Sequence, residues 1–279
     1  MKKDAEKTLK VGWYPQSKVT DVRLIDRLNA AAGQLPTATK FGNWTSYKFY
    51  MSGEKSDYMW YVDITLDGNK YRGVYIKRAR PFDVSGDSSD FDQRGYQDYF
   101  GYRVGKVYWF EFEPIEFLVL DVADGISLVY SRYVLDAMQF DNKGIWEYTA
   151  YEDSELRAWL NDDFLHTAFT ESERQAFAEF ASGDIVSLLS KEEYERFCIT
   201  GEGWRKDKRM TTDYARCMGV DAESAYGICN FYWLRSVKED DALGAIFYGV
   251  GTLGGIENLC CSSEKMGGGV VPALRVKIG

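Results

Sequence analysis

The stretch YMWYVDITLDGNKYRGVYI, residues 58–76, places two runs of alternating side chains on either side of Asp67-Gly68-Asn69. Alternation with a period of two is typical of strands, because successive side chains point to opposite faces of a sheet. Gly68 can adopt the positive φ that a tight turn requires. The stretch therefore predicts a β-hairpin whose strands cover residues 58–66 and 71–76.

A second hairpin is predicted further along the chain. Residues 107–112 read as a strand, Pro114 turns the chain at a corner, and residues 115–122 continue as a strand. Ala123-Asp124-Gly125 then repeats the turn signal, and residues 126–130 return as the partner strand. Between the two hairpins, residues 83–105 are rich in Asp, Ser and Gly and predict a loop insertion.

A strand and then a helix are predicted before the first hairpin. Residues 10–16 read as a short strand that Pro15 ends, and Thr20 or Asp21 can cap the helix that follows. Gly33 is expected to close that helix, because glycine accepts the left-handed backbone with which helices commonly end.

Helices are predicted from about residue 153 to residue 219. Thr170–Glu173 and Ser190–Glu193 are capping boxes, in which a hydroxyl and a carboxylate accept hydrogen bonds from backbone amides that the helix leaves unpaired. Asp153 or Ser154 is expected to begin the first helix of this region, and Thr211-Thr212 the last. Strands are predicted again after Tyr226, at residues 229–234, 245–250, 256–261 and 270–278.

The order of strands, then helices, then strands predicts an α+β fold with antiparallel twisted sheets, flanking helices and long loops. No Pro- or Ser-rich linker and no internal repeat divides the sequence, so we expect a single domain over residues 1–279. We also expect the last strand, residues 271–276, to pair with the first strands and bring the two ends of the chain together.

The chain is acidic and rich in aromatic side chains. Its 279 residues include 34 Lys or Arg and 43 Asp or Glu, which gives a formal charge of −9, and 16% of them are aromatic. Proteins that bind nucleic acid draw most of their affinity from Lys and Arg, so the acidic balance argues against a nucleic-acid partner. The single histidine, His166, excludes any metal site or proton relay that needs two.

No stretch of the sequence predicts a signal peptide or a membrane helix. The residues after Met1 mix basic and acidic side chains, whereas a signal peptide needs an apolar run of about 7–15 residues there. The longest apolar runs fall far short of the roughly 20 residues of a spanning helix. We therefore expect a soluble protein without membrane insertion. It would be cytoplasmic if Met1 is the natural start, and secreted or at the cell surface if an export signal has been removed.

The cysteines argue against a disulfide framework. They are Cys198, Cys217, Cys229, Cys260 and Cys261, an odd number without a C-x-x-C motif. We expect free thiols, most of them buried, and no metal site built from them.

Seven segments, taken in order, carry a resemblance to a known family. They are Trp13–Asp21, Glu113–Leu120, Leu156–Asn161 with Thr167–Thr170, Ile185–Ser190, Thr211–Ala215, Trp233–Ser236 and Val271–Leu274. Together they resemble an uncharacterised bacterial domain family of unknown function, whose fold is similar to C-type lectins and to formylglycine-generating enzymes. The resemblance covers roughly residues 10–278. It implies a C-type-lectin-like architecture and assigns no activity.

The resemblance places the ligand face in residues 237–269, which correspond to the ligand face of lectin-like folds. Side chains that project from this Gly-rich region are the predicted ligand-binding residues, namely Asp240, Asp241, Tyr248, Glu257 and Asn258, with Lys238, Glu239, Glu264 and Lys265 beside them. Calcium needs clustered oxygen ligands, and the Glu-Pro-Asn and Trp-Asn-Asp signatures of calcium lectins are missing. We therefore predict no cofactor and a protein or carbohydrate ligand.

Three residues are predicted to belong to the scaffold. Trp233 and Arg235 lie two apart and share one face of a strand, so they could form an aromatic and cationic platform for a ligand. The favoured interpretation is structural: Trp233 packs in the core, and a carboxylate or backbone carbonyls hold Arg235. Trp159, on the first helix of the central region, is expected to pack in the same core.

These observations favour a non-catalytic binding module over an enzyme. One alternative is an oxidoreductase-like enzyme related to formylglycine-generating enzymes, in which Cys260 and Cys261 would bind copper. Adjacent residues on a strand point to opposite faces, which disfavours that site. The other alternative is a structural or assembly module that uses the high aromatic content as an oligomer surface. The sequence leaves the oligomeric state open.

Overall fold

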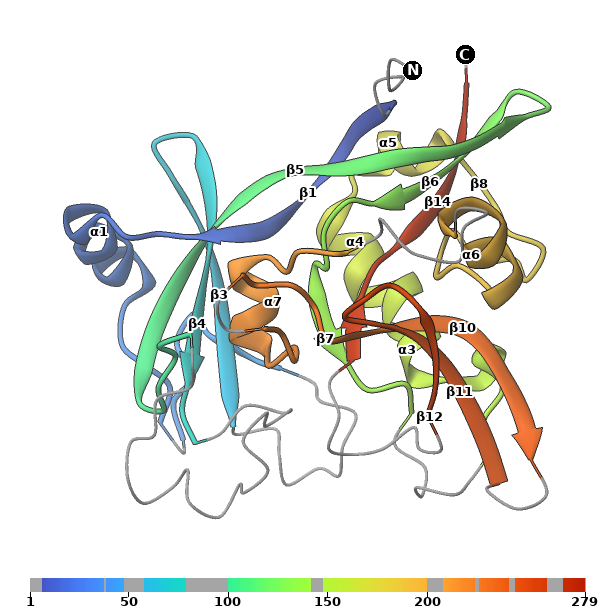
Figure 1. Ribbon diagram of the computed structural model, residues 1–279. Coiled ribbons are helices and arrows are strands. Elements are labelled where there is room, and N and C mark those ends of the chain that lie inside the picture. Colours follow the sequence, from blue (N-terminus) through green and yellow to red (C-terminus); the bar gives the residue numbers. More distant parts are fainter. Residues whose placement is uncertain are drawn as a thin grey trace.

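A computed structural model of the chain describes residues 7–37, 39–47, 58–78, 100–141, 148–199, 208–223, 226–240, 244–259 and 268–278. In these ranges the chain forms two largely antiparallel sheets with short helices packed around them (Figure 1), which confirms the predicted α+β class. Most of the predicted loop insertion at residues 83–105 lies outside the described residues.

The larger sheet is organised by one long strand. Its strands are β1 (Thr8–Lys18), β2 (Thr45–Ser46), β3 (Met59–Leu66), β4 (Asn69–Ile76), β5 (Lys106–Ala123), β6 (Ile126–Ser131), β8 (Phe177–Ala178), β9 (Val186–Ser187) and β14 (Ala273–Lys277). The main path runs β2-β3-β4-β5-β6-β14-β8, with β1 paired to β5 and β9 to β14. Strand β5 therefore connects the N-terminal part of the sheet to the C-terminal part.

Strand β5 has β1 on one edge and two successive partners on the other. Phe110 pairs with both β1 and β4, and Leu118 pairs with both β1 and β6, so β4 and β6 share the edge opposite β1. Pairing with β4 ends at Glu111 and pairing with β6 begins at Phe117. Between them, residues 112–116 have β1 as their one strand neighbour among the described residues.

Both predicted hairpins are confirmed. Asp67 and Gly68 connect β3 to β4 with φ values of 53° and 84°, and Asp124 and Gly125 connect β5 to β6 with 52° and 73°. Two successive residues at positive φ form the turn whose twist matches that of the flanking strands.

The predicted ending of a strand at Pro15 and the predicted corner at Pro114 are wrong. Strand β1 continues through Pro15, which lies opposite Phe112, and β5 continues through Pro114, which lies opposite Trp13. At each proline the strand has a partner on one edge alone. The proline nitrogen, which carries no hydrogen, can face the other edge, so no ladder hydrogen bond is lost.

The helices begin where the sequence predicts. Asp21 caps α1 (Val22–Ala32), and Gly33 ends it with φ 76°. Ser154 caps α3 (Glu155–Trp159), which follows the short helix η2 (Tyr151–Asp153) and continues through a π-helical turn, η3 (Leu160–Phe164), into α4 (Leu165–Ala168). Complete capping boxes begin α5 (Glu171–Gln175) and α6 (Lys191–Cys198), and Thr212 caps α7 (Asp213–Met218).

The smaller sheet has the order β12-β11-β10-β13-β7. Its strands are β7 (Asp136–Met138), β10 (Phe231–Asp240), β11 (Gly244–Gly251), β12 (Ile256–Leu259) and β13 (Gly268–Val270), and only the β10–β13 contact among them is parallel.

The last strand shares the larger sheet with the first strand but does not pair with it. Strand β14 pairs with β6, β8 and β9, whereas β1 pairs with β5. The expected direct pairing is wrong, because the β5–β6 hairpin inserts both of its strands between β1 and β14.

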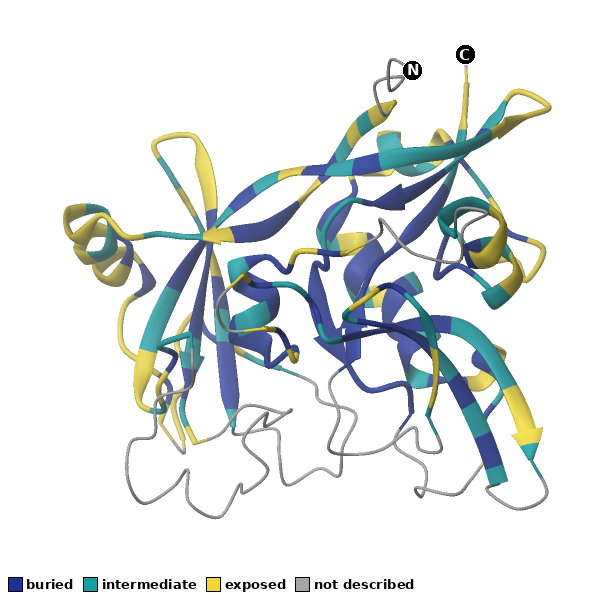
Figure 2. Cartoon of the chain, in the orientation of Figure 1, coloured by how far each residue is buried: buried dark blue, intermediate teal, exposed yellow. Residues whose placement is uncertain are grey.

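The main core lies between the two sheets and the central helices. Figure 2 shows buried residues concentrated on β6, β7, β14 and the neighbouring helices, whereas much of α1 and the β5–β6 turn are exposed. A separate small core joins α1 to β3–β5, where Trp109 packs across Gly73 and donates from Nε1 to Asn29 Oδ1 at 2.9 Å. In the described ranges, no helix has the length and apolar character needed to cross a membrane.

Candidate functional site

The predicted ligand residues lie on the strands of the smaller sheet. Apart from residues 241–243, residues 237–259 belong to β10, β11, β12 and the short β11–β12 turn, so strands cover the predicted range 245–250 and the described part, 256–259, of the predicted range 256–261, and β10 continues to Asp240, beyond its predicted end at residue 234. Tyr248 lies opposite Asn258, and Glu257 lies opposite Gly249, so alternation points Glu257 to the other face. Asp240 ends β10 opposite Gly244, four residues along β11 from Tyr248.

The structure thus brings Tyr248 and Asn258 together and separates Glu257 and Asp240 from them. The ammonium of Lys191 lies 4.8 Å from the centroid of the Tyr248 ring, and the side chain of Asn258 is exposed. Asp241, Glu264 and Lys265 lie outside the described residues, as do Cys260 and Cys261, so the copper alternative stays a prediction.

The cysteines that the structure describes form no disulfide with one another. Cys217 and Cys229 are buried and Cys198 is half-buried. Burial raises the pKa of Cys229 to about 12, so this side chain stays a thiol rather than a reactive thiolate. In the described part of the chain, no group of three or more His, Cys, Asp and Glu side chains could hold a metal ion.

The two predicted scaffold tryptophans lie in the main core. Trp233 is fully buried, and its Nε1 donates to the Met138 carbonyl at 2.7 Å, which ties β10 to β7. The Trp159 ring packs 5.5 Å from the ring of Phe164, and 8% of its surface is exposed.

Arg235 is held by a carboxylate and a carbonyl. Its Nη1 forms an ion pair with Glu193 Oε2 at 2.6 Å and donates to the Leu188 carbonyl. Glu193 Oε2 also accepts from the Ser190 amide at 2.8 Å, because Glu193 completes the capping box of α6. The guanidinium therefore fastens the start of α6 to β10. Its side chain is still 25% exposed and faces a cavity.

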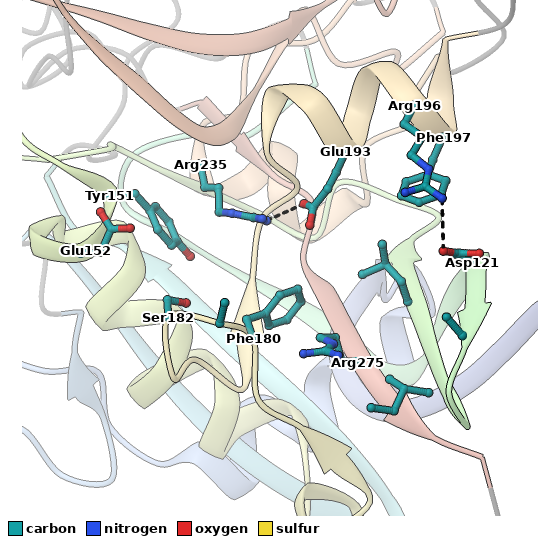
Figure 3. A pocket seen from close by; sticks show the side chains of 14 residues that line it. Asp121, Tyr151, Glu152, Phe180, Ser182, Glu193, Arg196, Phe197, Arg235 and Arg275 are labelled. Atoms are coloured by element: carbon teal, nitrogen blue, oxygen red, sulfur yellow. Dashed lines mark ion pairs between the residues drawn. The ribbon is translucent and has the colours of Figure 1, made fainter.

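The cavity beside Arg235 has a volume of about 470 Å³ (Figure 3). Its walls come from the β5–β6 hairpin, from β14, from residues 180–182 and from α6, while η2 and β10 close one side. All but two of its lining residues, Asp121 and Ala123, come from the part of the chain after residue 123.

Charged side chains of both signs line this cavity. Besides the Arg235–Glu193 pair, Arg196 of α6 lies 4.0 Å from Asp121 at the exposed rim. Arg275 of β14 points toward the centre in Figure 3, and its Nη1 donates to the Glu179 carbonyl at 2.6 Å. Glu152 adds a third carboxylate. The paired charges keep free donors and acceptors, because a guanidinium carries five N–H groups and a carboxylate about four lone-pair sites.

Aromatic and aliphatic side chains form the rest of the surface. Phe180 lies with its ring 5.8 Å from the Arg235 guanidinium, and Phe197 projects from α6. The Tyr151 hydroxyl accepts from Ser187 Oγ at 3.4 Å, and burial raises the pKa of Tyr151 above its ordinary value, so its ring stays neutral. Ile126 and Leu128 of β6 complete the apolar wall. Such a surface can hold a ring-shaped polar molecule by stacking and by hydrogen bonds together.

Sequence reasoning identified one residue of this cavity, Arg235, and interpreted it as scaffold. Arg196 and Phe197 lie on a short helix whose existence was predicted, and Arg275 lies on a predicted strand, yet no local pattern links these positions. Phe180 and Arg275 come together because β8 pairs with β14. That pairing joins residues almost a hundred positions apart, which alternation and capping signals do not specify.

Residues 124–278 match a protein family described as "Domain of unknown function (DUF6273)". The match includes the cavity-lining residues of η2, α6, β10 and β14 and excludes the quoted segments at residues 13–21 and 113–120. No curated protein and no solved structure matches the chain.

Proposed function

The chain belongs to the DUF6273 family, a domain of unknown function that covers residues 124–278, and we propose that it is a non-catalytic glycan-binding module. We propose that its scaffold is C-type-lectin-like and that the 470 Å³ cavity holds one sugar unit of the ligand. Two antiparallel sheets with short helices around them, together with the ordered segments quoted above, support this choice of scaffold.

One observation carries the glycan proposal. The cavity combines aromatic rings with three guanidinium groups and three carboxylates, of which Arg235 and Glu193 and Arg196 and Asp121 form ion pairs, so its walls offer many hydrogen bonds with little net charge. Sugars present hydroxyls around a ring that has apolar faces, and a site of this composition matches both features. Its volume lies within the usual range of about 300–1,000 Å³ for small-molecule sites.

The screen uses a glycan array with and without calcium. We expect at least one glycan to bind, and we expect chelation of calcium to leave binding unchanged, because no calcium ligand set is found in the described residues. A glycan that binds is then titrated against Phe197→Ala, which removes a stacking surface, and Arg275→Gln, which removes a central charge. Each variant should weaken binding by about tenfold or more, equivalent to about 1.4 kcal/mol.

Matched controls separate the cavity from other surfaces. Trp13→Ala removes an exposed aromatic ring and Arg23→Gln an exposed guanidinium, both outside the cavity, so both should bind as the parent protein does. Tyr248→Ala and Asn258→Ala test the surface predicted from the sequence. If these two variants weaken binding and Phe197→Ala and Arg275→Gln do not, the cavity assignment is wrong. If no glycan binds, the function itself is wrong.

A further inference from the structure

A second cavity, of about 210 Å³, lies between the N-terminal strands and the family domain. One wall comes from β1–β4 with Tyr47, and the other comes from β7, α3, η3, α4 and α7. Tyr14 reaches it from the part of β1 that lies opposite Glu113, inside the stretch of β5 that has no second strand neighbour among the described residues. The two cavities share no lining residue.

Aromatic rings make up much of this second cavity. Tyr14, Tyr47, Tyr61, Trp159 and Tyr214 line it. The Tyr47 and Tyr61 rings lie 4.8 Å apart, and the Tyr14 and Tyr214 rings meet edge to face at 5.6 Å. A hydrogen bond of 3.0 Å joins the hydroxyls of Tyr47 and Tyr214 across the two walls. Rings gathered in this way present negative π faces, which attract cations.

Asp136 supplies a buried carboxyl group among these rings. It is 3% exposed; its Oδ2 accepts from the Tyr14 hydroxyl at 2.5 Å and its Oδ1 from the Ala137 amide at 2.8 Å. Among the described residues it has no ion-pair partner within 4.0 Å. Burial raises the pKa of Asp136 to about 7, although the hydrogen bonds from Tyr14 and Ala137 and the charge of Arg72 act to lower it.

The cation that lines the cavity, Arg72, already forms an ion pair with Asp63. It donates to both oxygens of Asp63 at 2.7 and 2.9 Å, with its guanidinium 4.6 Å from the centroid of the Tyr61 ring. Although burial opposes the shift, this guanidinium and the Lys70 ammonium, which lies 3.3 Å from Asp63 Oδ2, hold the pKa of the Asp63 carboxyl below its ordinary value, so Asp63 is the ion-pair partner of both cations. Asp163, on the π-helical turn η3, adds a second carboxylate to the lining.

We propose that this cavity binds an organic ammonium ion, a primary or methylated amine, with Asp136 as its counter-ion and the tyrosine rings as its walls. A bound anion would face two carboxylates, and the guanidinium that could hold it is already engaged by Asp63. A neutral ligand would make no use of the charge that Asp136 can carry, and beside it the buried carboxyl would be ionised only at a cost. An ammonium group satisfies both the carboxylate and the ring faces.

The site belongs to the whole chain rather than to the family domain alone. Tyr14, Tyr47, Tyr61 and Arg72 precede residue 124, whereas Asp136, Trp159 and Tyr214 follow it. The proposal is also independent of the glycan-binding function, because variants in one cavity leave the lining of the other intact.

The experiment compares two probes of nearly equal shape. Choline carries a quaternary ammonium, and 3,3-dimethyl-1-butanol replaces its nitrogen with carbon. Ligand-observed NMR on the full chain measures the dissociation constant of each. We expect choline to bind at least about tenfold more tightly, because the π faces and Asp136 act on charge. Asp136→Asn, which removes the charge but keeps the shape, should abolish this preference, whereas the exposed control Asp26→Asn should retain it.

The pH dependence tests the role of Asp136 directly. Below about pH 7 the ammonium ion must displace a proton from Asp136, so the dissociation constant should rise by about tenfold per pH unit as pH falls, and should level off above that value. The titratable groups that face Asp136 are Tyr14 of β1, Tyr47, Arg72 of β4, Asp163 of η3 and Tyr214 of α7. Burial raises the pKa of the three tyrosines, so they stay neutral in this range. If the dissociation constant of Asp136→Asn does not change with pH, the group that titrates is Asp136 and not Asp163.

Two further results would overturn the proposal. One is equal binding of choline and its neutral analogue by the parent protein. The other is the absence of choline binding at millimolar concentration by a protein whose circular dichroism shows that it is folded. Tyr61→Leu provides a second variant at the half-buried rim: loss of its ring should weaken choline binding, and unchanged binding would argue against the aromatic walls.

Discussion

We expect Trp233 and Gly268 to be energetically coupled, so that the effects of substituting them on the free energy of unfolding do not add. A Cβ atom on Gly268 would lie 2.2 Å from Trp233 Nε1, so the indole occupies the space that any larger residue would need. The same nitrogen donates to the Met138 carbonyl at 2.7 Å. The perturbation is therefore a pair of variants, Trp233→Phe and Gly268→Ala, made separately and together.

The structure gives the magnitude of each change. Trp233→Phe leaves the buried Met138 carbonyl without its donor, which costs about 1–3 kcal/mol. The missing part of the indole adds on the order of 1 kcal/mol for the space it leaves. Gly268→Ala forces a methyl group against the indole edge and should cost about 1–3 kcal/mol through overpacking. In the double variant that methyl group enters the space vacated by the indole. The double variant should therefore lose less free energy of unfolding than the sum of the two single variants, by about 1 kcal/mol or more.

Urea unfolding followed by far-ultraviolet circular dichroism measures all four proteins, because tryptophan fluorescence changes with the substitution itself. The control pair is Trp233→Phe with Gly105→Ala, since a Cβ atom on Gly105 meets no neighbouring atom. These two distant changes should add. If the costs of Trp233→Phe and Gly268→Ala also add to within about 0.5 kcal/mol, the proposed packing of the indole on Gly268 is refuted.

Two further predictions concern stability. Gly12→Ala should lower the free energy of unfolding by more than about 2 kcal/mol, because Gly12 has φ 72° and its Cβ would lie 2.4 Å from the Phe169 ring; a melting temperature equal to that of the parent would contradict this close contact. Asp136 has a pKa of about 7 in the folded protein against 3.8 for the free side chain, so its protonated form favours folding, and that contribution is lost as pH rises through about 7. Asp136→Asn should therefore gain stability relative to the parent between about pH 4 and pH 7, by up to about 1.4 kcal/mol per pH unit, and a difference that does not change with pH would refute the assignment. Glu155, whose pKa burial also raises to about 7, is present in both proteins and cancels in this comparison.

Local signals in the sequence predicted the local structure well. Asp67-Gly68 and Asp124-Gly125 form the predicted turns, and the hydroxyl and carboxylate of Thr170–Glu173 and Ser190–Glu193 form the predicted capping boxes. In each case the physical cause acts within four residues, so the sequence contains it in full.

Features that depend on distant neighbours were missed. Pro114 was expected to turn the chain at a corner, but whether a proline interrupts a strand depends on how many neighbours the strand has there, and the gap between β4 and β6 is a property of the whole sheet. Asp136 was also missed, although one signal was available. It is a carboxylate in the middle of the apolar run from Val134 to Met138. A charged residue in such a run indicates either a buried polar site or a run that is not buried.

Strand β5 pairs with β4 and then with β6 along one edge, and this has a consequence for any protein trimmed to residues 124–278. Such a fragment would begin at the turn. It would keep β6 but lose Phe117–Ala123, the part of β5 that pairs with β6. One side of β6 would then present open amides and carbonyls, which invite a second copy to add its own strand. In the full chain, β5 covers this edge of β6 from outside the matched region.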